Sequence, residues 1–231
     1  GNVTDMTGMF YGCTNLTYLN LLNFNTKKVR DMRSMFSYCL FLTSLDLSQF
    51  NTENVTRMDG MFRSCIRLTN LDLQSFSTEN VTTMLQMFYR CYSLRSLNLQ
   101  SFNTEKVTDM YEMFSECTDL SSLNLSNFNT EKVTSMERMF QGCSALTKIH
   151  CKTTWSNKNS RDMFGGCENL KGVVAYDSLR VDATMANPET GYFTKRIPGE
   201  TEAYVAQSAD KTTLTFYYDA QRDSRTEHTW D

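Results

Sequence analysis

The sequence predicts an α/β solenoid, a right-handed leucine-rich-repeat coil of about six to seven 26-residue repeats, each with a short helix and a parallel strand. The first observation is a strict period, because one valine, one phenylalanine and one cysteine recur every 26 residues. They are Val3, Val29, Val55, Val81, Val107 and Val133; Phe10, Phe36, Phe62, Phe88, Phe114 and Phe140; and Cys13, Cys39, Cys65, Cys91, Cys117 and Cys143. The second is composition, since 13 of the 14 methionines fill two further columns of this period. A column is the set of residues at one position of the repeat, and each column is expected to occupy one structural environment. We number the coils one to six, beginning at the six valines.

The first half of each coil has the spacing of a helix. Coil five shows the i, i+3, i+4, i+7 pattern of an apolar helical stripe, in Met110, Met113, Phe114 and Cys117. The expected helix caps are Thr108 and, as a capping box, Thr134 with Glu137. The sequence thus predicts a helix of about two turns in every coil.

The second half of each coil reads as a strand. Leu120, Leu123 and Leu125 form the L-x-x-L-x-L pattern of a leucine-rich repeat. Strand alternation points the leucines inward and Asn124 outward. His150 holds the same position in coil six, so we expect it to be solvated. Because no coil can bury its own apolar side chains, stacked coils are expected to bury one another's.

Three segments are expected along the chain. Residues 1–175 form the solenoid, including a shorter seventh coil around Met163 and Phe164. Residues 176–201 read as a C-terminal cap, because terminal repeats need a cover. Residues 202–231 alternate apolar and polar around Ser208–Lys211, which predicts a β-hairpin extension or the start of a next module.

Composition narrows the classes of function. The net charge is −3, which excludes a basic nucleic-acid footprint. No apolar run approaches the roughly 18 residues of a membrane span, so any membrane attachment needs an anchor outside this segment. There are two histidines, His150 and His228, with no paired zinc-ligand spacing. A nucleophile with a base is not indicated either, so we expect neither an enzyme nor a cofactor.

Two weaker metal hypotheses remain beside simpler interpretations. Met9 and Cys13 lie four residues apart on one expected helical face, a pairing that suits Cu(I), but the same face packs on the leucines. Asp46 and Asp72 are expected cross-strand neighbours, which calcium could bridge, although two hydrated aspartates explain them as well. The expected site residues therefore include no metal ligand.

The cysteines are expected to be buried free thiols. Seven of the eight lie in the helix column and Cys151 takes a leucine position, so all eight fall at core positions. Column neighbours about 5 Å apart with parallel Cβ directions have poor disulfide geometry. Oxidised neighbouring pairs are the alternative.

The repeat V-T-x-M-x-x-M-F-x-x-C-x-x-L-x-x-L-x-L-x-x-F-N-T resembles those of BspA-like bacterial leucine-rich-repeat surface proteins and of mycoplasma-type surface lipoproteins. The resemblance covers roughly residues 2–175. The segments Glu202–Tyr204, Leu214–Asp219 and Arg222–Arg225 also look like parts of that family. It implies bacterial cell-surface display and adhesion to host or partner proteins. It implies no catalysis and supplies no binding residues to carry over.

Positions that vary between coils are free of packing constraints, and coils two to four fill them with aromatic, aliphatic and arginine side chains. We call this set the Tyr–Arg strip: Tyr38, Leu40, Phe41, Arg63, Ile66, Arg67, Tyr89, Arg90 and Tyr92. Such residues are typical of interface anchors, and an interface there should appear as the largest exposed apolar patch. The alternative is that these side chains fold over the coil edge and cover the core.

The outward strand face is a second candidate surface. Its rows are small and polar: Tyr18, Ser44, Asn70, Ser96 and Ser122; Asn20, Asp46, Asp72, Asn98 and Asn124; and Ser48, Gln74, Gln100 and Ser126. Such a face could bind an extended glycan or a protein weakly through many hydrogen bonds, or it could be inert.

The functional hypothesis is a non-catalytic, cell-surface or extracellular bacterial module for adhesion and protein–protein interaction. Its partner would be a protein, for example one of the host extracellular matrix or an epithelial surface, bound through a rigid repeat face. The alternative is a passive structural spacer that displays another domain.

Overall fold

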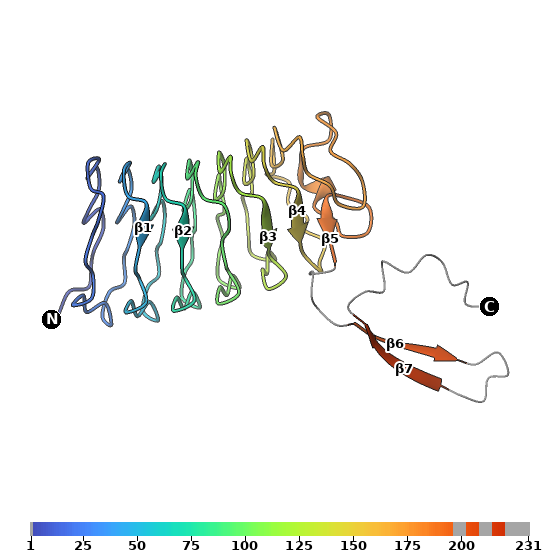
Figure 1. Ribbon diagram of the computed structural model, residues 1–231, viewed down its shortest axis with the longest axis horizontal. Helices are drawn as coiled ribbons and strands as arrows, with labels where there is room; N and C mark the ends of the chain where they lie inside the picture. Colours follow the sequence, from blue (N-terminus) through green and yellow to red (C-terminus); the bar gives the residue numbers. More distant parts are fainter. Residues whose placement is uncertain (1, 196–201, 208–213, 220–231) are drawn as a thin grey trace. The chain divides into compact units, whose positions relative to one another are not determined.

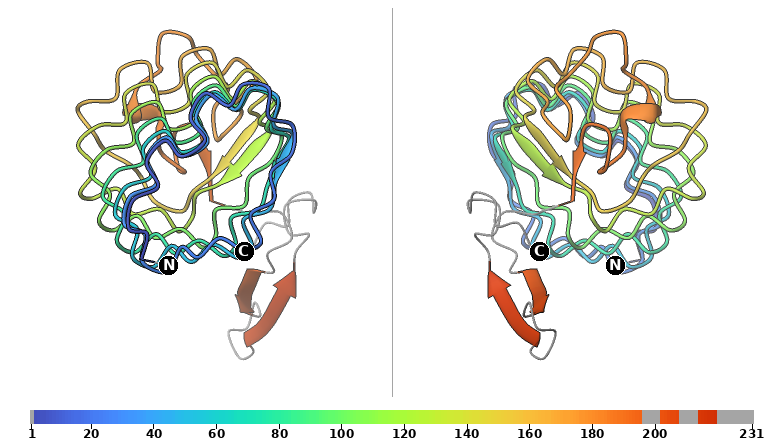
Figure 2. Two further views of the ribbon diagram at one scale, coloured as in Figure 1. Left: turned by 90° about the vertical axis from the view of Figure 1, so that its left-hand side faces the viewer. Right: turned by 90° about the vertical axis from the view of Figure 1, so that its right-hand side faces the viewer.

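In the computed structural model, the described residues are 2–195 together with two strands at 202–207 and 214–219. The chain divides into two compact units, Gly1–Lys195 and Arg196–Asp231. The first unit is a row of stacked coils, seen from the side in Figure 1 and along the stack in Figure 2. The apolar columns of the repeat fill the interior of these coils.

Successive coils pair in parallel with an offset of one repeat. A chain of single bridges links Asp5 to Asp31, Asp31 to Arg57, and so on through Thr83 and Asp109 to Ser135, each step 26 residues long. On another side of the coils the strands are short: β1 (Ser44–Leu45) pairs with β2 (Asn70–Leu71), and β3 (Ser122–Asn124) with β4 (Lys148–His150). The period in the sequence is thus the register of the stack.

The predicted fold class, an α/β solenoid of helix-plus-strand repeats, is wrong. Residues 2–195, 202–207 and 214–219 contain no α-helix, and the strands of the stack are only two or three residues long. Thr108, Thr134 and Glu137 therefore cap no helix. Instead the Thr108 and Thr134 hydroxyls donate to carbonyls one coil back, at 3.1 and 2.9 Å.

The segment expected to be helical is a series of tight turns. The Phe36 N–H donates to the Met61 carbonyl of the next coil at 2.9 Å, whereas the Cys39 N–H donates to the Phe36 carbonyl within its own coil at 3.2 Å. An α-helix would use every such N–H internally, four residues back. Ser34 and Tyr38, with φ of 53° and 61°, lie in the left-handed region that interrupts a right-handed helix.

The spacing between coils explains why turns replace helices. Neighbouring rings of the phenylalanine column stack with centroids 5.5–5.7 Å apart and planes within 10° of parallel. An α-helix with its side chains is about 10 Å across, so helices cannot stack at this spacing. The i, i+3, i+4, i+7 pattern still marks the inward positions, since Met110, Met113, Phe114 and Cys117 are all fully buried.

Two buried polar columns join the coils from inside. The Thr78 hydroxyl donates to the Asn103 carbonyl at 2.8 Å and accepts from the Asn103 N–H at 2.7 Å. The same pairs form at Thr26, Thr52 and Thr104. The Cys91 thiol donates to the Phe62 carbonyl of the preceding coil at 3.1 Å, and five other cysteines repeat this bond. Each buried hydroxyl or thiol therefore satisfies a backbone group of a neighbouring coil.

The far end of the stack is covered by residues after coil seven. Strand β5 (Phe193–Thr194) adds in parallel to β4, and a single 3-10 turn, η1 (Ala183–Met185), lies beside it in sequence. Trp155 packs edge-on against Phe193, with centroids 4.9 Å apart. The expectation of a solvated His150 is wrong, because β5 buries it to 7% exposure and brings its Nδ1 within 3.0 Å of the Thr194 hydroxyl.

The second unit contains β6 (Glu202–Gln207) and β7 (Leu214–Asp219), which pair antiparallel. The expected turn at Ser208–Lys211 and the segment Arg222–Arg225 lie outside the described residues. No helix within the described part of the chain is long and apolar enough to cross a membrane.

All eight cysteines are free, but one expectation about them is wrong. Cys13 is exposed, as is Met9 in the same coil, because coil one has no preceding coil in the described chain to cover it. The other seven thiols are buried. Burial raises the pKa of the Cys39 thiol to about 11 and the pKa values of Cys91 and Cys167 to about 12.

We expect Thr78→Val to lower the free energy of unfolding by about 1–3 kcal/mol, because it leaves both backbone groups of Asn103 without their partner. The matched control is Thr82→Val, whose exposed hydroxyl makes only one bond, to the Thr56 carbonyl at 3.2 Å. That variant should change stability by about 0.5 kcal/mol or less. Urea unfolding curves measure both, and equal losses would contradict the role of the buried column.

We expect Ellman's reagent at about pH 8 to modify Cys13 at once and the seven buried cysteines only after unfolding. The reactive species is the thiolate, which burial suppresses at the other positions. In Cys13→Ser the fast phase should vanish. Rapid reaction of several thiols in the folded chain would show that the cysteine column is open to solvent. Fewer than eight reactive thiols in the unfolded, unreduced chain would show that some cysteines are oxidised.

Candidate partner-binding surface

The Tyr–Arg strip lies on the turn segments that follow the buried phenylalanine and cysteine columns. Six of its side chains are half-buried: Tyr38, Leu40, Arg63, Ile66, Tyr89 and Tyr92. Phe41, Arg67 and Arg90 are exposed, with Phe41 at 38%. The strip therefore combines rings that are partly packed on the coils with arginines that reach solvent.

Arg63 is held between two tyrosines from the coils on either side. Its guanidinium carbon lies 5.6 Å from the Tyr38 ring centroid and 5.3 Å from the Tyr89 ring centroid. Its Nη1 donates to the Gln86 Oε1 at 2.7 Å, while its Nε is buried with no hydrogen-bond partner among the described residues. Arg63 thus links coils two, three and four.

Two further arginines stack on rings of the strip. The Arg90 guanidinium lies 5.0 Å from the Tyr89 centroid, and that of Arg67 lies 4.3 Å from the Phe41 centroid. Each such contact is worth about 0.5–1 kcal/mol at an exposed site. The ring contacts therefore form two sets: Tyr38, Arg63, Tyr89 and Arg90 in one, and Phe41 with Arg67 in the other. Leu40 and Ile66 lie between these residues in sequence, and Tyr92 follows them.

The strip includes a strained backbone column. Tyr38 and Arg90 have φ of 61° and 59°, the region that favours glycine, and Gly12 and Gly142 occupy the same column in coils one and six. A non-glycine residue there costs about 1–2 kcal/mol. In coils two and four the chain carries that strain together with a large side chain that contacts its neighbours across the surface.

Sequence reasoning missed two neighbours of the strip. Tyr11 packs edge-on against Tyr38, with centroids 5.5 Å apart and planes at 67°. Tyr11 lies at the same position of the repeat as Arg63 and Tyr89, and this shared position could have identified it from the sequence. The sequence does not indicate Gln86, because Gln86 and Arg63 occupy different positions of the repeat and their hydrogen bond joins two columns.

The polar network continues beyond the strip toward acidic coils. The Gln86 Nε2 donates to the Glu112 carboxylate at 2.7 Å, and the Arg138 Nη1 lies 3.6 Å from the other oxygen of that carboxylate. Glu116 follows Arg90 in its column, and Asp119 lies in the column of Arg67. The surface therefore changes from arginine in coils three and four to carboxylate in coil five.

Exposed large apolar side chains gather elsewhere, contrary to the expected patch over coils two to four. Among the described residues they include five in coil one, namely Val3, Met9, Tyr11, Tyr18 and Leu22. Phe41 alone represents the strip. The strip is therefore an array of rings and cations and not a continuous apolar patch.

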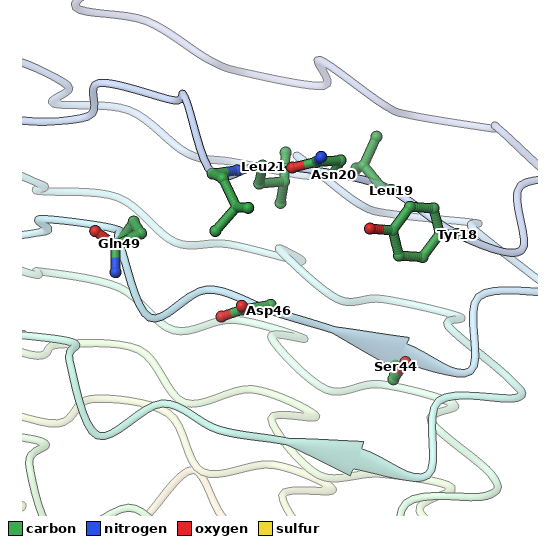
Figure 3. Close-up of a pocket in the computed structure, with 8 residues that line it drawn as sticks. Tyr18, Leu19, Asn20, Leu21, Ser44, Asp46 and Gln49 are labelled. Atoms are coloured by element: carbon green, nitrogen blue, oxygen red, sulfur yellow. Dashed lines mark hydrogen bonds between the residues drawn. The ribbon is translucent and has the colours of Figure 1, made fainter.

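The strand face carries a hollow of about 140 Å³ between coils one and two, shown in Figure 3. Tyr18 stands at one side of it, with Asn20, Asp46 and Gln49 around it (Figure 3). Three leucines, Leu19, Leu21 and Leu22, also line it, so polar and apolar groups are mixed there.

The outward aspartates close turns of their own chain. The Asp46 Oδ1 accepts from the Ser48 N–H at 3.0 Å, and the Asp72 Oδ1 accepts from the Gln74 N–H at 2.9 Å. The bond from Ser48 lowers the pKa of Asp46 below its usual value. Among the described residues no three histidine, cysteine or acidic side chains group as metal ligands.

Comparison with known families gives one match. Residues 1–95 and 65–176 match the family described as "Mycoplasma protein of unknown function, DUF285". The matched ranges together span the stacked coils. No curated protein matches the chain.

Proposed function

The chain belongs to the DUF285 family of mycoplasma proteins, and we propose that it is a non-catalytic cell-surface module that binds a partner protein through the Tyr–Arg strip. The resemblance of its repeat to BspA-like leucine-rich-repeat surface proteins supports display at a bacterial surface. In this proposal any membrane attachment comes from an anchor outside these 231 residues.

The observation that carries the proposal is the stacking of three arginines on rings contributed by successive coils. Arg63 contacts Tyr38 and Tyr89, and Arg67 contacts Phe41. Tyrosine and arginine are the residues most enriched among energetically dominant interface positions. Because the rings are partly packed on the stack, little side-chain freedom remains to be lost on binding.

Binding suits the described chain better than catalysis. The histidine of the coils, His150, is buried under β5 against Thr194 and is not available as a base at the surface. The strip presents arginines and tyrosines without a nucleophile beside a base. The proposed partner is a protein of the host extracellular matrix or epithelial surface.

The test compares the full chain with Phe41→Ala/Ile66→Ala/Tyr92→Ala on a panel of purified extracellular-matrix and epithelial surface proteins. Removing three interface side chains should weaken binding by about tenfold or more, since each anchor contributes roughly 1 kcal/mol or more. Biolayer interferometry measures the affinities. The matched control, Ser96→Ala/Gln100→Ala, truncates exposed positions on the strand face and should bind as the original chain does.

Thermal unfolding of the triple variant separates binding from stability. A variant that stays folded and loses binding supports the proposal. Loss of binding only through unfolding would mean that the strip merely covers the core. Failure of the original chain to bind any protein of the panel would favour the alternative function, a spacer that displays another domain.

A further inference from the structure

We infer that the Tyr–Arg strip recognises an acidic segment of its partner protein, with Arg67 and Arg90 as the groups that bind the carboxylates. This inference rests on the proposed function and specifies the chemistry of the partner. It comes from two arginines of the strip that are held against aromatic rings and make no ion pair with a described carboxylate.

Four arginines outside the strip are paired with carboxylates of their own chain, whereas Arg30, Arg95 and Arg180 make neither an ion pair nor a ring contact with a described residue. The pairs are Arg33 with Asp31 at 2.7 Å, Arg57 with Asp59 at 3.0 Å, Arg138 with Glu112 at 3.6 Å, and Arg161 with Glu137. In contrast, Arg67 and Arg90 make no side-chain hydrogen bond or ion pair with any described residue. Their contacts are with the rings of Phe41 and Tyr89.

Stacking on a ring positions a guanidinium and leaves its binding groups open. The attraction between a ring and the guanidinium charge uses no hydrogen bond, so the five N–H donors remain available. These donors form a rigid fork that matches a carboxylate through two parallel hydrogen bonds. The strip therefore presents two oriented forks, on coils three and four, that lack an acceptor within the described chain.

The charge of the next coil favours a short acidic protein segment over a long polyanionic glycan. Glu116 lies one coil beyond Arg90 in the same column, and Asp119 lies two coils beyond Arg67. A sulfated polysaccharide running along the stack would pass over these carboxylates. Its sulfates would be repelled there, because like charges at close range repel. An acidic segment confined to coils two to four avoids them and also contacts the half-buried Ile66.

The experiment uses the full chain with two fluorescent probes, a short poly-L-glutamate peptide as the source of carboxylates and heparin as the sulfated polysaccharide. The test variant is R67E/R90E, which leaves Arg63 in place because that residue bonds Gln86. Position 90 tolerates glutamate, since Glu116 holds the equivalent place with φ of 62°. The control K132E/R180E makes the same change in net charge at exposed positions outside the strip.

The original chain and the control should bind poly-L-glutamate with equal affinity, and R67E/R90E should bind roughly tenfold or more weakly. Added NaCl should weaken the binding of the original chain, because salt screens exposed charges. Equal losses in the two variants would overturn the inference, since net charge alone would then explain them. Tighter binding of heparin than of poly-L-glutamate would overturn it in favour of a glycan.

A bound protein from the panel distinguishes this inference from the proposed function. If Phe41→Ala/Ile66→Ala/Tyr92→Ala no longer binds that protein while R67E/R90E still binds it, the strip is the interface but the bound segment is not acidic. If both variants lose it and both remain folded, the function and the inference stand together. If both retain it, both are wrong.

Discussion

The hydrogen bonds between successive coils are the constraint on which the rest of the structure depends. In the regular coils most of them join backbone groups 25 or 26 residues apart, as in the bond from the Met84 N–H to the Asp109 carbonyl and the bond from the Thr108 N–H to the Thr82 carbonyl. With this register, each side chain lies beside its counterpart in the next coil. The phenylalanine rings then stack, and each buried threonine or cysteine meets a backbone group that it can satisfy. Each 26-residue repeat thus forms one coil of the stack, hydrogen-bonded to the coil before it and the coil after it.

The sequence was sufficient to locate the core and insufficient to give its backbone conformation. Met110, Phe114 and Cys117 are buried as their spacing predicts. However, a periodicity of three and four residues fits both a helix and a series of tight turns that point the same positions inward. What decides between them is the distance between coils, and that distance follows from tertiary packing. The non-glycine residues at positive φ, such as Ser34 and Glu112, give no local sign of a left-handed backbone.

The candidate site divides in a similar way. Variation between coils identified the positions of the strip, and the structure joins Tyr38, Arg63 and Tyr89 by direct contact between the guanidinium and the rings. The contacts themselves were not predictable, because they depend on side chains that reach from one column to another. Gln86 is the clearest example, since it bonds Arg63 across columns. His150 was misplaced because the strand that covers it, β5, comes from outside the repeat.

The left-handed column bears on whether the strip serves only to hold the stack together. Glycine is the residue of least strain at such a position, and coils one, six and seven have it there, at Gly12, Gly142 and Gly166. Coils two to five have other residues there, Tyr38, Ser64, Arg90 and Glu116, whose backbone strain of about 1–2 kcal/mol each must be offset by contacts. Stacking on Arg63 and Tyr89 supplies part of that offset. Because Ser64 and Glu116 carry the same backbone strain outside the strip, the strain alone does not mark a binding surface. An arginine held over a ring with its donors open, by contrast, has already lost the side-chain freedom that a partner would otherwise have to remove.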